Sequence, residues 1–253
     1  MRSLLLALLL LPTLARALDD GQVLGILKEV DTQRRNNGDF KARIFMEAHE
    51  KDKNDQVFDA VVYRRDADDK LMILFLDPKT ERGKGYLRLD KNMWYYDPRV
   101  GKWERRTERE RIGGTDGNRR DFDESRLADE YAGKWVQDGK LGIFATHELE
   151  LTAKPGIDVA FPKIKLWIDQ AAHTVLKEQR FAASGKLQQT VLYPKWKKIY
   201  SESKGADVWF PYEIRIFDEI EKANRTIIVM REVDLKPLES NLFTKAWLES
   251  KSR

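Results

Sequence analysis

Polar and apolar residues alternate along most of the chain. Between residues 40 and 49, apolar side chains recur at every second position, from Phe40 through Ile44 to Ala48. This period of two is typical of a β-strand that buries one face. Similar stretches follow, separated by turns such as DADD, ERGKG and DPRVG. We therefore expect further strands at QVFDAVVYRR, KLMILFLD, KGYLRLD, MWYYD, KWERRTE, ATHELELTAK, PKIKLWIDQ, TVLKEQRF, GKLQQTVLY, KKIYSE, VWFPYEIRIF and RTIIVMREV.

The stretch DDGQVLGILKEVDTQRR has a different period. Its apolar residues recur at three- and four-residue spacing, and an aspartate precedes them that can cap a first helical turn. The stretch therefore predicts an amphipathic helix at the start of the mature chain. Its apolar stripe consists of Val23, Leu24, Leu27 and Val30, and the capping residue is Asp19 or Asp20.

A second break in the alternation covers residues 109–143. The sequence ERERIGGTDGNRRDFDESRLADEYAGKW favours a glycine-rich loop followed by a short helix. Asp121 or Asp123 can cap this helix, and Leu127 and Tyr131 lie one turn apart on it. We expect this segment to leave the sheet, where it could act as a lid.

About a dozen predicted strands and two main helices favour a mainly β protein. One large, strongly curved antiparallel sheet with helices against its concave side accommodates these elements. Residues 18–253 contain no proline-, glycine- or serine-rich linker and no internal repeat. We therefore expect a single domain after the first seventeen residues.

Those first seventeen residues have the pattern of a secretory signal peptide. Met1 and Arg2 precede the apolar run SLLLALLLLPTL, and ARA at residues 15–17 places small residues where a signal peptidase requires them. The run is shorter than the roughly 20 apolar residues of a spanning helix. The chain has no cysteine to be acylated or to form a disulfide bond. We expect a soluble mature protein that begins at Leu18 and works in the periplasm without a lipid anchor.

The mature chain is close to neutral. Residues 1–17 include two arginines and no acidic residue, so their removal lowers the formal net charge from +4 to +2. Basic and acidic side chains alternate within stretches such as KARIFMEAHEKDK. Nucleic-acid binding usually requires a patch of one sign. We therefore expect no nucleic-acid partner.

The sequence offers little catalytic chemistry. His49, His147 and His173 fall on separate predicted strands, and no cysteine is available to complete a zinc site. IGGTDGN lacks the lysine and hydroxyl residue of a phosphate-binding loop, and DFDES lacks the glycine and distal glutamate of a calcium loop. We expect no enzyme, metal or cofactor, although carboxylates paired across the sheet could still hydrolyse a glycoside.

Three stretches resemble the LolA-like outer-membrane lipoprotein-sorting proteins: MWYYDPRVGKW, PKIKLWIDQAAHTVLKEQRFAASGKLQQTVLY and the closing LFTKAWL. The resemblance follows the order of elements over most of residues 40–248. It implies a half-open β-barrel, covered by helices, that binds acyl chains in an apolar cavity and carries lipid-modified cargo through the periplasm. In that family an arginine holds the lid closed, but the sequence assigns this role to no single arginine here.

The resemblance implies a monomeric, cofactor-free carrier of lipoprotein acyl chains or lipid, moving cargo towards the outer membrane. Its partners would be an inner-membrane transporter and an outer-membrane acceptor. The alternative is an exported accessory or scaffold subunit of an inner-membrane lipid transporter, whose concave face grips a protein.

Apolar positions in several predicted strands are candidates for the wall of such a cavity. Strand alternation places them on common faces, and the DPRVG turn brings two aromatic stretches side by side. Ordinary core packing produces the same pattern, so spacing leaves both interpretations open. The candidates are Trp94, Tyr96, Trp103, Leu149, Leu151, Ile164, Leu166 and Ile168.

The signal peptide yields a direct test. If it is cleaved after ARA, the intact mass of the periplasmic protein corresponds to a chain that starts at Leu18. A mass that retains residues 1–17 would contradict both the cleavage and the expected location.

Overall fold

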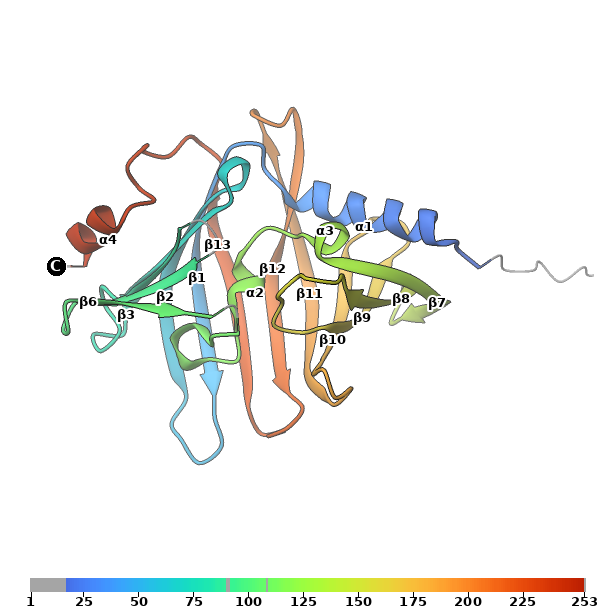
Figure 1. Cartoon of the computed structure of the whole chain (residues 1–253), viewed down its shortest axis with the longest axis horizontal. Coiled ribbons are helices and arrows are strands. Elements are labelled where there is room, and N and C mark those ends of the chain that lie inside the picture. The colour runs from blue at the N-terminus through green and yellow to red at the C-terminus, as the bar shows by residue number, and fades with distance from the viewer. Residues whose placement is uncertain (1–16, 90–91, 108, 253) are drawn as a thin grey trace, which may run out of the picture.

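The computed structural model describes residues 17–89, 92–107 and 109–252, which form one 13-stranded antiparallel sheet with four α-helices and two short 3-10 helices (Figure 1). The strand order is β6-β5-β4-β3-β2-β1-β13-β12-β11-β10-β9-β8-β7. The strands are β1 (Asp39–His49), β2 (Gln56–Arg65), β3 (Lys70–Asp77), β4 (Gly85–Leu89), β5 (Asn92–Asp97), β6 (Lys102–Arg106), β7 (Tyr131–Leu141), β8 (Phe144–Ala153), β9 (Lys163–Asp169), β10 (Val175–Phe181), β11 (Leu187–Ser201), β12 (Ala206–Asp218) and β13 (Arg225–Asp234). The helices are α1 (Asp20–Arg34), α2 (Arg119–Phe122), α3 (Leu127–Glu130) and α4 (Lys245–Lys251), with η1 (Asp66–Asp68) and η2 (Ile112–Gly114).

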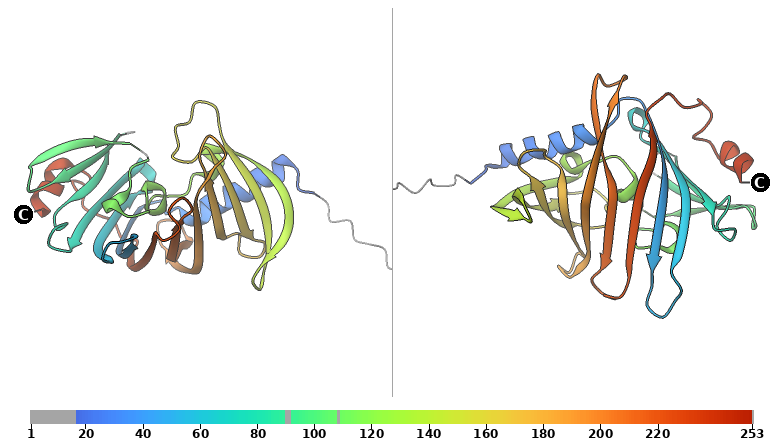
Figure 2. Two further views of the ribbon diagram at one scale, coloured as in Figure 1. Left: turned by 90° about the horizontal axis from the view of Figure 1, so that it is seen from below. Right: turned by 180° about the vertical axis from the view of Figure 1, so that it is seen from behind.

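This topology leaves the sheet open. The first strand, β1, lies in the middle of the sheet. From there the chain runs strand by strand to one edge at β6 and crosses to the other edge at β7. It then returns strand by strand until β13 pairs with β1. Seen from below (Figure 2, left), the sheet is bent, and residues of the crossing segment lie between its two halves. The predicted fold class, a large curved antiparallel sheet that does not close into a barrel, is confirmed.

Helix α1 covers part of the concave face. It contacts β7, β12 and α3. Asp19 caps it through a capping box with Gln22, as one of the two predicted capping residues. Val23, Leu27 and Val30 are buried, as predicted, because they face the interior of the bent sheet, whereas Leu24 of the predicted stripe is exposed.

The crossing from β6 to β7 covers the rest of the concave face. We call residues 109–130 the covering segment; it contains η2, α2 and α3. One of its glycines is required by geometry. Gly113 has φ 63°, and a Cβ atom there would lie 2.9 Å from the Cζ atom of Phe75. The IGGTDGN stretch is therefore a fitted turn packed against β3.

The C-terminal helix covers the opposite face at the other end of the sheet. Leu248 of α4 packs with Met72, Leu74 and Leu87 in a second apolar cluster, separate from the main one. The alternate residues of β3, such as Ile73, belong to the main cluster. β3 and β4 are thus buried on both faces, which explains the continuous apolar run KLMILFLD of β3.

The structure departs from the predicted elements in three places. The loop-and-helix segment ends at Glu130, because Tyr131–Leu141 is β7 and pairs with β8. The stretches GKLQQTVLY and KKIYSE, predicted as two strands, form one long strand, β11, with bulges. Asn118, and neither predicted aspartate, caps α2.

The predicted signal peptide lies outside the described residues except for its last residue, Ala17. Among the helices of the described residues, none combines the length and apolar character that a membrane crossing needs.

The packing of α1 gives a matched pair of stability variants. Leu27 is 1% exposed and Leu24, one turn away, is 38% exposed. Leu27→Ala should lower the free energy of unfolding by about 3 kcal/mol, because it leaves a cavity in the interior. Leu24→Ala should change it by less than about 0.5 kcal/mol. Urea unfolding measures both, and equal effects would show that α1 does not pack on the sheet in this orientation.

Candidate functional site

The concave face carries the main apolar cluster of the molecule. Leu149 lies opposite Leu166, and Leu151 lies opposite Ile164, across β8 and β9. These side chains and Ile168 are at most 1% exposed. The structure therefore brings five of the eight candidate residues together in one closed wall.

Helix α1 lies directly over this wall. A Cβ atom added to Gly133 of β7 would lie within 3.1 Å of Val23 and Leu27 of α1 and also of Leu151. Only a glycine permits so close an approach of the helix to the strand. Access to the wall therefore requires movement of α1 or of the covering segment.

The structure separates the three aromatic candidates from this wall. Tyr96 and Trp103 stack at 5.0 Å between ring centroids and belong to the α4 cluster on the outer face. Lys245 lies 3.8 Å from the ring centroid of Trp94, and Trp103 donates a hydrogen bond of 2.6 Å to Glu249. These rings hold the C-terminal helix. On β5 it is Tyr95 that packs against the main cluster.

A buried ion pair fastens the covering segment to β10. Arg180 is completely buried, and its Nη2 atom donates to Asp121 of α2 at 2.6 Å. Its remaining nitrogens donate to Glu178 at 3.0 Å and to Gln189 at 3.1 Å. All three nitrogens of this guanidinium thus donate to partners inside the protein.

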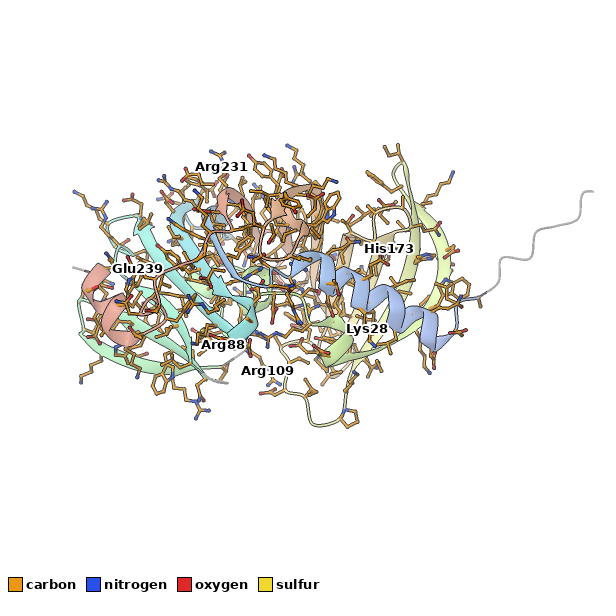
Figure 3. All side chains as sticks on the ribbon, turned by 90° about the horizontal axis from the view of Figure 1, so that it is seen from above. Lys28, Arg88, Arg109, His173, Arg231 and Glu239 are labelled. Carbon is orange, nitrogen blue, oxygen red and sulfur yellow. The ribbon has the colours of Figure 1, made fainter. Side chains whose placement is uncertain are left out.

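A second pair fastens the segment to β4. Arg88 donates to Asp123 and to Asp69, each at 2.8 Å. Arg126 of the segment also contacts Asp69 and Glu124. Seen from above (Figure 3), Arg88 and Arg109 lie on the covered side of the sheet, and Arg231 lies on the opposite side.

Helix α1 supplies the third attachment. Asp31 accepts hydrogen bonds from the backbone nitrogens of Leu127 and Ala128, at 2.9 and 2.7 Å, and so caps α3 from another helix. Arg35 pairs with Glu124 at 2.7 Å. The covering segment and α1 therefore form one joined cover over the concave face.

Burial and neighbouring charges shift the pKa values of two glutamates at the cover in opposite directions. Burial raises the pKa of Glu124 to about 7, with Asp66 and Asp123 adding to the shift and Arg35 opposing it. Burial would also raise the pKa of Glu178, but Arg180 and Arg120 outweigh it and lower that pKa to about 2. Glu124 is thus the acidic residue of the cover that titrates near neutrality.

Sequence reasoning missed these fastening residues, although β10 carried a signal. Glu178 and Arg180 lie opposite Leu166 and Ile164, at the inward positions of the strand. A strand whose inward positions are charged must place partners for them inside the protein. That pattern in TVLKEQRF pointed to a buried polar network without naming its partners.

Two open cavities adjoin the cover. A groove of about 750 Å³ lies at the upper end of the sheet in Figure 1, between the β11–β12 hairpin and the chain that leaves β13. Its walls include Ile199 and Leu235, which also pack against the main cluster. A more polar pocket of about 350 Å³ lies beside residues 109–118.

Titratable residues do not gather into a metal site within residues 17–252 as the structure describes them. No group of three or more histidine, aspartate or glutamate side chains there has the arrangement needed to hold a metal ion. His147 pairs with Asp138, and His173 pairs with Glu29 of α1.

Known structures share this architecture. A LolA superfamily protein from Nitrosomonas europaea has 20% sequence identity and a TM-score of 0.74, covering 88% of this chain and 97% of that protein. An outer-membrane lipoprotein-sorting protein domain from Vibrio parahaemolyticus has 18% identity and a TM-score of 0.79, with 91% and 100% covered. A DUF1329 family protein from Desulfovibrio piger has 18% identity and a TM-score of 0.77, with 90% and 97% covered.

These likenesses establish the fold and confirm the LolA-like resemblance. No curated protein sequence matches the chain. A family model described as "Uncharacterized protein" matches residues 67–250, which is most of the chain. The chain therefore belongs to that family, and its fold is that of the LolA superfamily.

Proposed function

We propose that the protein is a periplasmic carrier that binds acyl chains of lipoproteins or lipids non-covalently and passes them towards the outer membrane. No chemical step is involved. An inner-membrane transporter would load it, and an outer-membrane acceptor would unload it. The likeness to the lipoprotein-sorting protein domain from Vibrio parahaemolyticus supports this direction.

One observation carries the proposal: an apolar concave face is closed by a cover that buried charges hold in place. The wall beneath α1 is aliphatic, with Leu149, Leu151 and Leu166 among its residues. The cover is attached by Asp121–Arg180, Asp123–Arg88 and the Asp31 cap. Polar attachments can exchange for contacts with water or a partner when the cover moves, whereas the apolar wall then needs a new apolar occupant.

The free energies that favour loading and oppose opening can be given as rough magnitudes. Each methylene group removed from water gains about 0.8 kcal/mol, so about ten of them gain roughly 8 kcal/mol before ordering costs. Breaking a buried ion pair by removing one partner costs about 3–5 kcal/mol.

The groove beside Ile199 and Leu235 is the proposed entrance. Its volume of about 750 Å³ is in the range of ligand sites, and its apolar walls continue into the main cluster. An acyl chain inserted there would contact Ile199 and Leu235, and movement of the cover would then open its way to the wall.

Lipid that co-purifies with the protein distinguishes this proposal from the accessory-subunit alternative. Protein isolated from periplasm free of membranes should release acyl lipids on organic extraction, detected by mass spectrometry. A lipid-free protein that also binds no acyl probe would favour an accessory subunit that grips a protein.

The entrance predicts the effect of a charge in its wall. Leu235→Glu should weaken binding of the uncharged fluorophore N-phenyl-1-naphthylamine by about tenfold or more. The new carboxylate must either lose its hydration shell or bring water into the groove. Val57→Glu is the matched control, since Val57 is 60% exposed on β2. Equal binding by both folded variants would exclude this groove as the entrance.

Glu124 predicts a pH dependence of the cover. Its pKa is raised in the folded protein, so between about pH 4.5 and 7 the closed state holds more protons than the open one. The stability of the closed cover should therefore fall as pH rises through this range. Binding of the hydrophobic dye 8-anilinonaphthalene-1-sulfonate should be stronger at pH 8 than at pH 5.

Glu124→Gln is the control for that measurement, because it keeps the shape of the side chain and removes its titration. The variant should show a smaller change in dye binding between pH 5 and 8. If the variant keeps the wild-type pH response, other groups cause the change in dye binding and Glu124 of the cover does not.

A further inference from the structure

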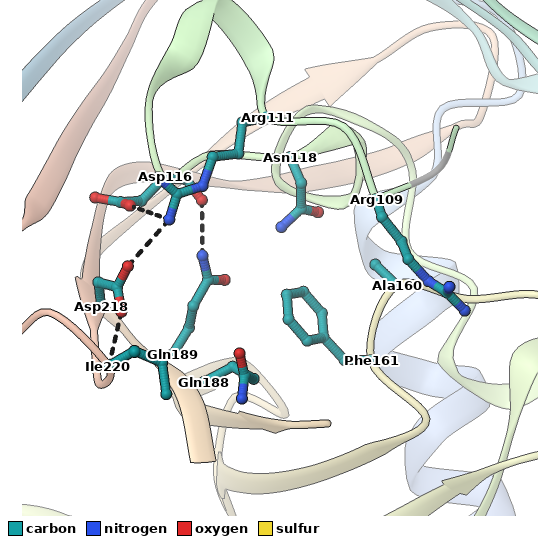
Figure 4. A pocket seen from close by; sticks show the side chains of 10 residues that line it. All are labelled: Arg109, Arg111, Asp116, Asn118, Ala160, Phe161, Gln188, Gln189, Asp218 and Ile220. Carbon is teal, nitrogen blue, oxygen red and sulfur yellow. Dashed lines mark hydrogen bonds and ion pairs between the residues drawn. The ribbon is translucent and has the colours of Figure 1, made fainter. Parts of the chain in front are cut away.

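The polar pocket beside the covering segment has the features of a second binding site (Figure 4). Its volume of about 350 Å³ lies within the range of small-molecule sites. The covering segment, the β8–β9 loop, β11 and the end of β12 each contribute to its wall. The residues used below are Arg109, Arg111, Asn118, Phe161, Gln189 and Asp218.

The acidic groups of this pocket already have partners. Arg111 Nη2 lies 3.0 Å from both Asp116 and Asp218. Asp218 also accepts hydrogen bonds from the backbone nitrogens of residues 220 and 221, and Asp116 accepts one from Thr226. One guanidinium thus bridges both carboxylates, and further oxygens of the pair accept hydrogen bonds from the protein.

Gln189 is satisfied as well. Its amide oxygen accepts from Arg180 at 3.1 Å, and its amide nitrogen donates to the Asp116 carbonyl at 2.9 Å. It forms a fixed part of the wall between β11 and the covering segment.

Asn118 is different. The side chain is 4% exposed, and its amide oxygen accepts from the Arg120 backbone as the cap of α2. Its buried Nδ2 atom has no hydrogen-bond partner in the described structure. Figure 4 shows this amide directed into the pocket, towards Phe161. A buried donor without an acceptor costs about 1–3 kcal/mol, which a ligand oxygen could recover.

Two further residues define the ligand. Phe161 presents its ring to the pocket, and Arg180 lies 5.3 Å from the ring centroid in the adjoining network. Arg109 can turn towards an anion, because its 3.4 Å contact with Asp158 joins two largely exposed side chains. Such exposed pairs contribute little and exchange readily.

We propose that this pocket binds an oxyanion, carboxylate or phosphate, carried on an apolar or aromatic body. The Asn118 amide and the Arg109 guanidinium donate to the oxyanion, and the body packs on Phe161. The site does not depend on acyl-chain binding by the concave wall, because its residues are separate from that wall.

Phenyl phosphate is the probe, since it combines an aromatic ring with a phosphate and has no acyl chain. Isothermal titration of the full-length mature protein should show saturable 1:1 binding. Asn118→Ser keeps a capping oxygen for α2 and removes the amide donor, and it should weaken binding by about tenfold. Arg109→Gln should weaken it by a similar factor.

Arg99→Gln is the matched control, because Arg99 is an exposed arginine paired with Asp97 in the β5–β6 turn and does not line the pocket. It should leave binding unchanged, and all three variants should keep the wild-type urea midpoint. Absence of saturable binding at millimolar phenyl phosphate would overturn the proposal. So would binding that Asn118→Ser and Arg109→Gln leave at the wild-type strength.

Competition identifies the source of the oxyanion. Displacement of phenyl phosphate by phosphatidylglycerol vesicles, and not by phosphatidylcholine vesicles, would assign the site to an anionic lipid headgroup. Displacement by inorganic phosphate alone would assign it to a free small anion. Either result supports the oxyanion site and tells the two sources apart.

Discussion

An open, strongly bent sheet must cover the apolar side that it turns inward, and the rest of this structure follows from that constraint. A closed barrel would bury its interior by itself, but here β6 and β7 end at opposite edges. Helix α1 and residues 109–130 therefore cover the concave face. Both elements contribute apolar side chains, such as Leu27 and Phe122, to the same interior cluster.

The way in which the cover is attached matters as much as its presence. Apolar contacts alone would hold it in any register, whereas Asp121–Arg180 and Asp123–Arg88 fix its position. These pairs join residues far apart in the sequence, so they close only when the sheet is complete. A cover positioned by charge can be released by a change of protonation or by a partner that offers competing charges, which suits the proposed loading and release.

The two ends of the sheet serve different purposes. Near β6, the outer face is covered by α4, and Tyr96 and Trp103 help to hold that helix. Near β7, the inner face is covered by α1, and Gly133 permits the close approach. The proposed oxyanion pocket lies where the covering segment passes between these ends, and the fixed Arg111–Asp218 contact forms part of its wall.

The sequence by itself determined most of the elements. A period of two located twelve of the thirteen strands, at least in part, and a capped three-to-four spacing located α1, because side-chain direction follows directly from backbone geometry. It also placed Leu149, Leu166 and their neighbours on common strand faces. A single strand cannot indicate which face will be inside, since both faces can be apolar near an edge covered by a helix.

The tertiary structure decided the rest. β7 contains glycines and charges that favour no strand, and it becomes one by pairing with β8. The faces of Trp94 and Tyr96 depended on where α4 packs. The partner of Arg180 was set by contact between residues 59 positions apart, a distance over which local periodicity carries no information. Long-range pairing between charged groups thus determined the candidate site, whereas local side-chain alternation determined the sheet.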